Sequence, residues 1–194
     1  LTTALISVNW LTYIWAMANE HILEASRGYY INLLVNSALG MIVLKERLNP
    51  AQWIAIGLAA AGVTYMTIGL GALPVVSLVL AFSFGFYALL RKRVAIEAIP
   101  GLTIETSILA PIGLVYVLVI GAGGTGNFLV GSTAMNWLLP AAGVVTVVPL
   151  LWFTAGARKL PMITIGMLQY LAATGQLLLA VLAYEAAFHA EHAL

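Results

Sequence analysis

Apolar runs of about twenty residues fill most of this chain, and they constrain its fold more than any other feature. A helix rises ~1.5 Å per residue, so about 20 apolar residues cross the ~30 Å hydrocarbon core of a bilayer. Breakers and turn formers separate the runs, as is usual between helices. The seven segments lie at residues 3–18, 25–44, 51–70, 74–90, 102–121, 135–156 and 162–184. We therefore predict an all-α, polytopic membrane helix bundle.

The overall composition supports this fold class and excludes several functions. Hydrophobic residues make up 62% of the chain and charged residues 8%, whereas soluble domains carry about 25% charged residues. A net charge of +1 gives no case for binding nucleic acid. Because cysteine is absent, disulfides, thiolate metal sites and a thiol nucleophile are excluded.

The basic residues predict how the chain is oriented in the membrane. Apart from Arg27, they fall in three alternate loops, as Lys45 and Arg47, as Arg91, Lys92 and Arg93, and as Arg158 and Lys159. Lys and Arg in short loops are retained on the cytoplasmic side of a membrane. We therefore expect the N-terminus of this chain to be cytoplasmic and its C-terminus to lie on the opposite side.

Two of the apolar segments carry a stripe of polar side chains. Tyr29, Asn32 and Asn36 share one face of segment 25–44, and Gln169 and Gln176 share one face of segment 162–184. Polar groups at membrane depth need partners, so these faces point to protein or to a wet cavity. Interhelical hydrogen bonding and the lining of a cavity both remain open for each residue. The two stripes occupy equivalent places in two similar stretches of the chain, and this favours the lining of a cavity.

Those two stretches form a weak internal repeat. Residues 28–32 lead to Glu46, and residues 166–170 lead to Glu185 in the same layout. The orientation given by the basic residues sends the two stretches in opposite directions through the membrane. Inverted repeats are common in secondary transporters, which bind substrate near the midplane where the repeats meet.

Further candidate substrate contacts are aromatic or polar residues in other segments. They are Asn9, Trp10, Ser83, Tyr87 and Tyr170. Ordinary packing between helices is the alternative for each of them.

Two charged residues complete the candidate set. Arg27 lies near the outer end of its segment, where it either reaches the lipid headgroups or contacts an anionic group of a substrate. Glu105 follows Pro100 and Gly101, so it either stabilises a first helical turn or takes part in proton coupling.

No pattern in the sequence predicts a metal, a cofactor or an enzyme. His189 and His192 fit one helical face but lack a firm third ligand. Neither a phosphate-binding G-x-x-x-x-G-K-[ST] loop nor a G-x-S-x-G nucleophile turn occurs. We expect no catalytic residues, no bound metal and no cofactor.

Short stretches along the whole chain resemble one known family. They include Val8-Asn9-Trp10-Leu11, Gly28-Tyr29-Tyr30-Ile31-Asn32, Ile104-Glu105-Thr106, Val148-Pro149-Leu150 and Leu168-Gln169-Tyr170. In order and spacing they resemble the EamA-type branch of the drug/metabolite transporter superfamily, specifically the RarD-like proteins.

The resemblance implies ten helices in two inverted five-helix repeats, within the inner membrane of a bacterium. On that plan this chain is a fragment covering helices three to nine. Residues 1–72 would be the last three helices of the first repeat, and residues 73–194 the first four of the second. The C-terminus of the chain would then be periplasmic. The implied partners are the lipid bilayer and a small-molecule substrate, and the sequence leaves a homodimer open.

The expected function is secondary transport, namely the export of a small metabolite, amino acid or drug by alternating access around a central cavity. The alternative is a non-transporting helical membrane scaffold, or a truncated, degenerate remnant of such a transporter. Its basis is that Leu33 and Ala173 stand where the family usually has a kinking proline.

Overall fold

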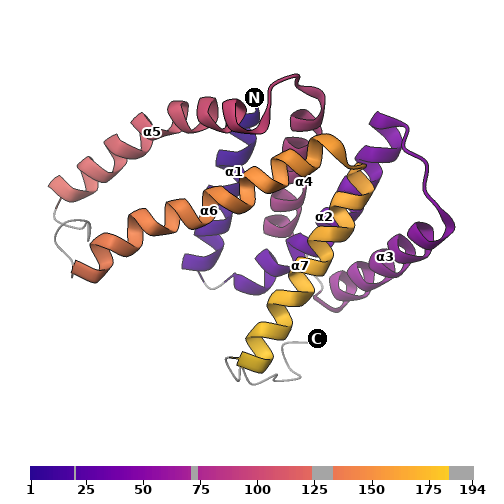
Figure 1. Ribbon diagram of the computed structural model, residues 1–194. Helices are drawn as coiled ribbons and strands as arrows, with labels where there is room; N and C mark the ends of the chain where they lie inside the picture. The colour runs from indigo at the N-terminus through magenta and orange to yellow at the C-terminus, as the bar shows by residue number, and fades with distance from the viewer. Residues whose placement is uncertain (20, 71–73, 124–132, 184–194) are drawn as a thin grey trace.

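The described part of the chain folds as a set of helices. The computed structural model describes residues 1–19, 21–70, 74–123 and 133–183, and these ranges contain no strand. The helices are α1 (Thr2–Ala18), α2 (Ile22–Leu44), α3 (Pro50–Leu70), α4 (Val75–Arg93), α5 (Ala98–Ala122), α6 (Thr133–Lys159) and α7 (Met162–Ala183). The all-α prediction is confirmed (Figure 1).

Three stretches of helix are long and apolar enough to cross a membrane. They are Val75–Arg93 in α4, Ala98–Ala122 in α5 and Asn136–Lys159 in α6. Shorter apolar stretches occupy Gly28–Leu44 in α2 and Met162–Leu171 in α7. The structure thus supports a helical membrane protein, whereas the seven spans and the ten-span inverted repeat remain predictions.

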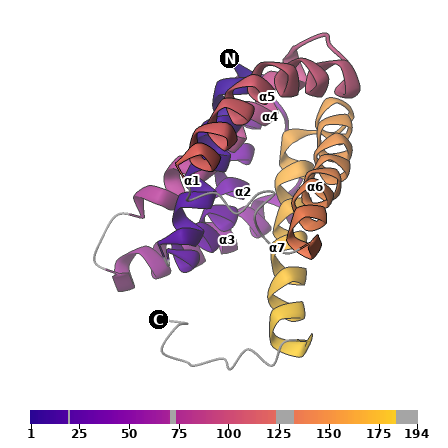
Figure 2. The ribbon, with the colours of Figure 1, turned by 90° about the vertical axis from the view of Figure 1, so that its left-hand side faces the viewer.

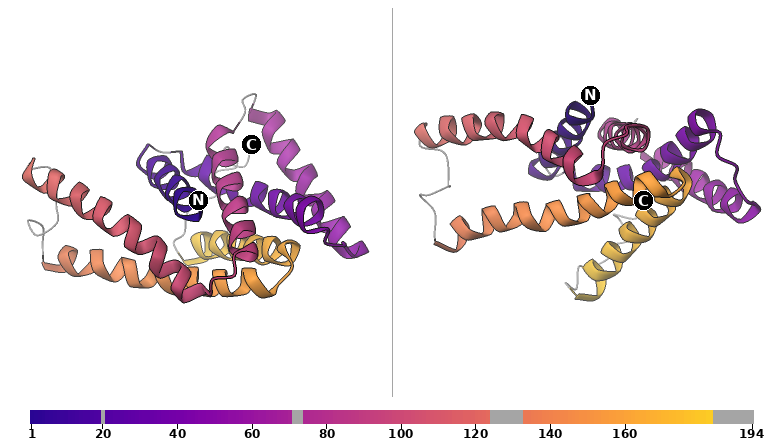
Figure 3. Two further views of the ribbon diagram at one scale, coloured as in Figure 1. Left: turned by 90° about the horizontal axis from the view of Figure 1, so that it is seen from above. Right: turned by 45° about the horizontal axis from the view of Figure 1, so that its top comes forward.

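Helices α2 and α4 form the centre of the arrangement. They pack closely on each other, α7 and α3 pack on α2, and α1 packs on α4. Figure 2 shows α6 and α7 on one side of the molecule and α1, α4 and α5 on the other. Helices α5 and α6 extend together beyond the others (Figures 1 and 3). Large apolar side chains on them, such as Leu114 and Val145, are exposed, which suits a hydrocarbon surrounding.

A glycine allows the central pair of helices to approach closely. Ile31 and Val35 of α2 form a buried cluster with Ala81 of α4. Beside this cluster, a Cβ atom added to Gly85 of α4 would lie only 2.7 Å from the Val35 Cγ1 atom. Small residues serve this purpose in membrane helices, where close backbone contact replaces the hydrophobic driving force of water.

Replacing Gly85 by alanine is therefore expected to destabilise the protein by about 1–3 kcal/mol, since the added methyl group overpacks the α2–α4 contact. The matched control is Gly62→Ala in α3, where nothing lies within 4 Å of an added Cβ. Alanine favours a helix over glycine by about 1 kcal/mol, so the control should be neutral or slightly stabilising. Thermal unfolding of both variants in detergent measures the difference, and equal midpoints would contradict the close approach.

The loops that carry the basic residues meet at one end of the molecule. Lys92 at the end of α4 lies 3.3 Å from Glu46 and donates to the Leu160 carbonyl oxygen, which precedes α7. The Arg93 guanidinium donates to the Val43 carbonyl oxygen at 3.1 Å, near the end of α2. These contacts agree with a shared side for the basic loops, although which face of the membrane they occupy remains a prediction.

Two helix starts differ from the sequence-based expectation. Helix α2 begins at Ile22, before the predicted segment 25–44, so Glu24 lies in its first turn. Helix α5 begins at Ala98, so Glu105 lies beyond the first turn and does not stabilise it. The reason is Pro100, which the first turn of a helix accepts because its missing N–H needs no intrahelical partner there.

Candidate functional site

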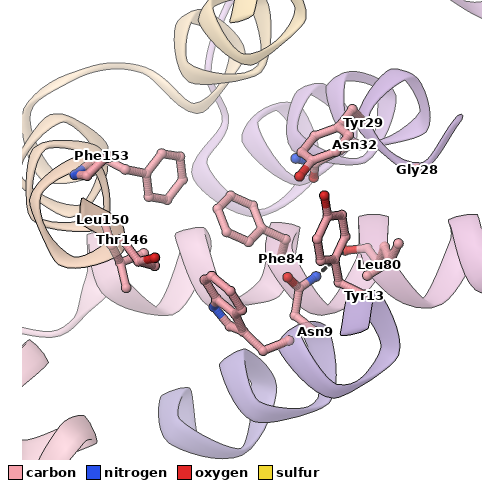
Figure 4. A pocket seen from close by; sticks show the side chains of 12 residues that line it. Asn9, Tyr13, Gly28, Tyr29, Asn32, Leu80, Phe84, Thr146, Leu150 and Phe153 are labelled. Atoms are coloured by element: carbon pink, nitrogen blue, oxygen red, sulfur yellow. Dashed lines mark hydrogen bonds between the residues drawn. The ribbon is translucent and has the colours of Figure 1, made fainter. Parts of the chain in front are cut away.

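A cavity of about 420 Å³ lies between α1, α2, α4 and α6 (Figure 4). Its lining residues are Asn9, Trp10, Tyr13, Gly28, Tyr29, Asn32, Leu80, Phe84, Thr146, Pro149, Leu150 and Phe153. Among the residues that the sequence predicted as substrate contacts, Asn9, Trp10, Tyr29 and Asn32 belong to this lining. They come from α1 and α2, which are far from α6 in the chain.

Aromatic rings provide much of the cavity wall. The ring of Phe84 in α4 packs on the ring of Phe153 in α6, with 4.8 Å between their centroids. Trp10 of α1 and Tyr29 of α2 also line the cavity and are each 39% exposed. The cavity therefore offers aromatic rings against which an aromatic or apolar ligand can pack, and two of these rings are partly exposed.

The side chain of Asn9 is fixed by two hydrogen bonds to α4. Its Nδ2 atom donates to the Leu80 carbonyl oxygen at 3.0 Å and to the Ser83 Oγ atom at 2.9 Å. Figure 4 shows the bond to Leu80, with the carboxamide oxygen turned away from it. Ser83, which was also predicted to contact substrate, does not line the cavity and instead helps to position Asn9.

The two asparagines of α2 share one acceptor on α7. The Nδ2 atoms of Asn32 and Asn36 donate to the Gln169 Oε1 atom at 2.8 and 2.9 Å. Asn36 is fully buried, while Asn32 also lines the cavity. Their Oδ1 atoms have no partner among the described residues. Interhelical hydrogen bonding is therefore observed for Asn36 and Gln169, and Asn32 combines both of the roles considered from the sequence.

An aromatic pair reinforces the same helix contact. The rings of Tyr30 and Tyr170 meet edge to face, with centroids 5.1 Å apart. Tyr170 is not among the residues that line the described cavity, so its predicted contact with substrate is untested.

A separate buried cluster joins α4 to α5. The Arg91 Nη2 atom lies 3.3 Å from the Glu105 Oε2 atom, and the Tyr87 hydroxyl donates to the same oxygen at 3.2 Å. The Arg91 Nε atom donates to the Tyr87 hydroxyl at 3.2 Å. Tyr87 and Glu105 were predicted to contact substrate, yet here they bind each other and Arg91 outside the lining of the cavity.

The sequence missed several of the residues that build these two places. Arg91 served only to orient the chain, although its spacing of four residues from Tyr87 places both on one face of α4. Thr146 and Phe153 were also not predicted as site residues. An aromatic or hydroxyl group in an apolar helix is compatible with any face, so the sequence held no signal for them.

Some predictions fall outside the described residues. The side chains of Arg27 and Gln176 are among them, so the roles expected for these two remain predictions. The same holds for His189 and His192. In the part of the chain that the structure describes, no group of three His, Asp or Glu side chains is arranged to bind a metal ion.

Known proteins resemble this chain over nearly its whole length. It is 53% identical over 93% of its residues to an uncharacterised transporter of Pseudomonas aeruginosa, of which it covers 60%. It is 48% identical over 95% of its residues to the protein RarD of Escherichia coli, of which it covers 62%. The chain is thus similar to RarD proteins over nearly all of its residues. The uncharacterised transporter YojE of Bacillus subtilis is 45% identical to it over all of its residues.

These relatives are longer than this chain, which spans less than two thirds of the length of each of them. The Pseudomonas aeruginosa and Bacillus subtilis relatives are named as transporters and not as enzymes, which agrees with the expectation of a protein that is not an enzyme. The chain matches no family profile and no solved structure.

Proposed function

We propose that this chain forms part of the substrate path of a secondary transporter in a bacterial inner membrane. The transporter would export a small metabolite, an amino acid or a drug by alternating access. The observation that carries the proposal is the cavity, which combines aromatic rings with carboxamides at the meeting point of α1, α2, α4 and α6. The relatives named as transporters support it.

The contacts around the cavity suggest how substrate would be linked to helix movement. Asn32 faces the cavity and also donates to Gln169 of α7. A ligand that binds Asn32 would compete with or strengthen its hydrogen bond to Gln169, and so alter the α2–α7 contact. In the proposed division at residue 72, α2 belongs to the first repeat and α7 to the second. Movement of one repeat against the other around a fixed site is the usual form of alternating access.

The proposed orientation places the basic end of the molecule in the cytoplasm, because Lys and Arg in short loops stay on that side. The turn after α2, the end of α4 and the turn before α7 are joined there by the Glu46 and Lys92 side chains. In this state these contacts would oppose opening of the path at the cytoplasmic end.

Transport can be tested with full-length protein in liposomes and a panel of labelled amino acids, aromatic amines and drugs. Replacing Tyr29 by leucine is expected to lower saturable uptake at least about tenfold, because it removes a ring that lines the cavity. The matched control is Tyr65→Leu in α3, whose side chain is 68% exposed and does not line the cavity. Both variants should unfold at the temperature of the unchanged protein.

A non-transporting scaffold or a degenerate remnant predicts another result. Uptake of every labelled compound would then be the same with and without the protein, although the protein is folded. Equal loss of uptake in the Tyr29 and Tyr65 variants would also contradict the cavity as the substrate path.

A further inference from the structure

The polar side chains in the cavity wall use their donor hydrogens within the protein and leave oxygen acceptors unused. Both amide hydrogens of Asn9 are used, by the Leu80 carbonyl oxygen and the Ser83 hydroxyl. A carbonyl oxygen only accepts, so the bond to Leu80 fixes which end of the carboxamide faces α4. The Asn9 oxygen is therefore the end left for a ligand (Figure 4).

Two further wall residues show the same pattern. The Thr146 hydroxyl donates to the Ala142 carbonyl oxygen at 2.8 Å, which leaves its lone pairs for another donor. Asn32 donates to Gln169, and its own Oδ1 atom is buried without a partner among the described residues. Buried acceptors without partners cost free energy, which a ligand that donates hydrogen bonds would recover.

The remaining wall favours positive charge. The faces of aromatic rings attract cations, tryptophan most strongly. Trp10, Tyr13 and Phe84 line the cavity together with the oxygen atoms described above. Among the described lining residues none is acidic or basic, so a cation meets no fixed positive charge in this wall, and an anion meets no cationic partner.

We propose that the cavity binds an organic ammonium compound, with the ammonium group at acceptor oxygens that the wall leaves unused, that of Asn9 among them, and an aromatic or branched apolar body against the rings. This inference rests on the proposed function and specifies its substrate class. A primary ammonium has three donor hydrogens and no acceptor, which suits a wall whose described polar side chains leave acceptors unused. The volume of about 420 Å³ lies within the range of roughly 300–1,000 Å³ found for small-molecule sites.

The test compares three probes that share one body and differ in their polar group. They are 2-phenylethylamine, 2-phenylethanol and 3-phenylpropanoate, and calorimetry measures their binding to full-length protein in nanodiscs at neutral pH. The amine should bind at least about tenfold more tightly than the alcohol, because only the amine adds cation–π contacts and charge-assisted hydrogen bonds. The carboxylate should bind more weakly than either, since it faces a wall of acceptors.

Two variants locate the binding. Trp10→Leu should weaken binding of the amine at least about fivefold, whereas Trp152→Leu should leave it unchanged, because Trp152 is 76% exposed and does not line the cavity. Thr146→Val keeps the shape of the side chain and removes one oxygen, so it should reduce the preference for amine over alcohol. If Trp10→Leu does not fold, Thr146→Val still tests the proposal.

Several results would overturn the inference. Failure of the amine to bind, equal affinity for amine and alcohol, or tighter binding of the carboxylate each contradicts an acceptor-lined site for ammonium. Equal loss in the Trp10 and Trp152 variants would place the binding outside the cavity. In all these cases the uptake assay with Tyr29→Leu still judges the transport proposal separately.

Discussion

Replacing Glu105 by leucine in the full-length protein is expected to lower the free energy of unfolding by about 3–5 kcal/mol. The cause is the Arg91 guanidinium, which is 3% exposed and would lose its carboxylate partner. Removal of one partner leaves a buried charge without compensation, and this costs more than the pair itself contributes. Arg91 has no room to move toward Gly101, because its guanidinium already occupies the place of a Cβ atom there.

The double variant Arg91→Met, Glu105→Leu distinguishes this cause from general damage to α5. Two apolar side chains of similar size leave no buried charge, so the double variant should recover most of the stability lost by Glu105→Leu. Glu97→Leu is the control, since Glu97 is an exposed residue at the start of α5 and should change stability by less than about 0.5 kcal/mol. Chemical unfolding in detergent measures all three. A double variant that is no more stable than Glu105→Leu would show that the ion pair does not carry the effect.

The positions of the helices could be predicted from the sequence because local features set them. An apolar run needs a helix in a membrane, and glycine, proline or charged residues end it. The main misplacements, at the starts of α2 and α5, have local causes too. A polar first turn is compatible with a helix, and proline is accepted within it. The all-α fold follows from these rules, whereas the burial of Arg91 depends on α5 folding back to bring Glu105 beside it.

The candidate site could be predicted only in part for a similar reason. The spacing of Asn32 and Asn36 showed that they share a face, and the face does meet another polar residue. The register between α2 and α7 decides that Gln169 is the shared acceptor, and no local pattern encodes that register. The lining of α1 was predicted from aromatic and amide residues, but Phe153 of α6 enters the cavity through tertiary packing alone.

Replacing Glu46 by alanine is expected to destabilise the protein by about 1–3 kcal/mol and to loosen the start of α7. The carboxylate accepts hydrogen bonds from the backbone N–H groups of Met162 at 2.9 Å and Ile163 at 3.4 Å. These groups have no partner within the helix, so a side chain from outside must satisfy them. Glu46 also lies 3.3 Å from the Lys92 ammonium, which adds an ion pair between two mostly buried side chains.

The turn after α2 is shaped for this contact. Lys45 adopts a left-handed conformation with φ of 56°, and the N–H groups of Lys45 and Glu46 both donate to the Gly40 carbonyl oxygen. The turn thereby directs the Glu46 carboxylate back along α2 to the first residues of α7. Since Gln169 lies on the same helix, Glu46 helps to fix the register at which Gln169 meets the asparagines of α2.

Two further variants separate the parts of this effect. Glu46→Gln keeps one acceptor oxygen and loses the charge, so it should cost less stability than Glu46→Ala. Glu24→Ala removes a carboxylate from an exposed pair with His21 and should cost less than about 1 kcal/mol. Hydrogen exchange at Met162 and Ile163 provides the local measurement, because their amide hydrogens should exchange faster only when Glu46 is replaced. Unchanged exchange at these two residues in Glu46→Ala would contradict the contact between the α2 turn and α7, and with it the idea that Glu46 sets the register at Gln169.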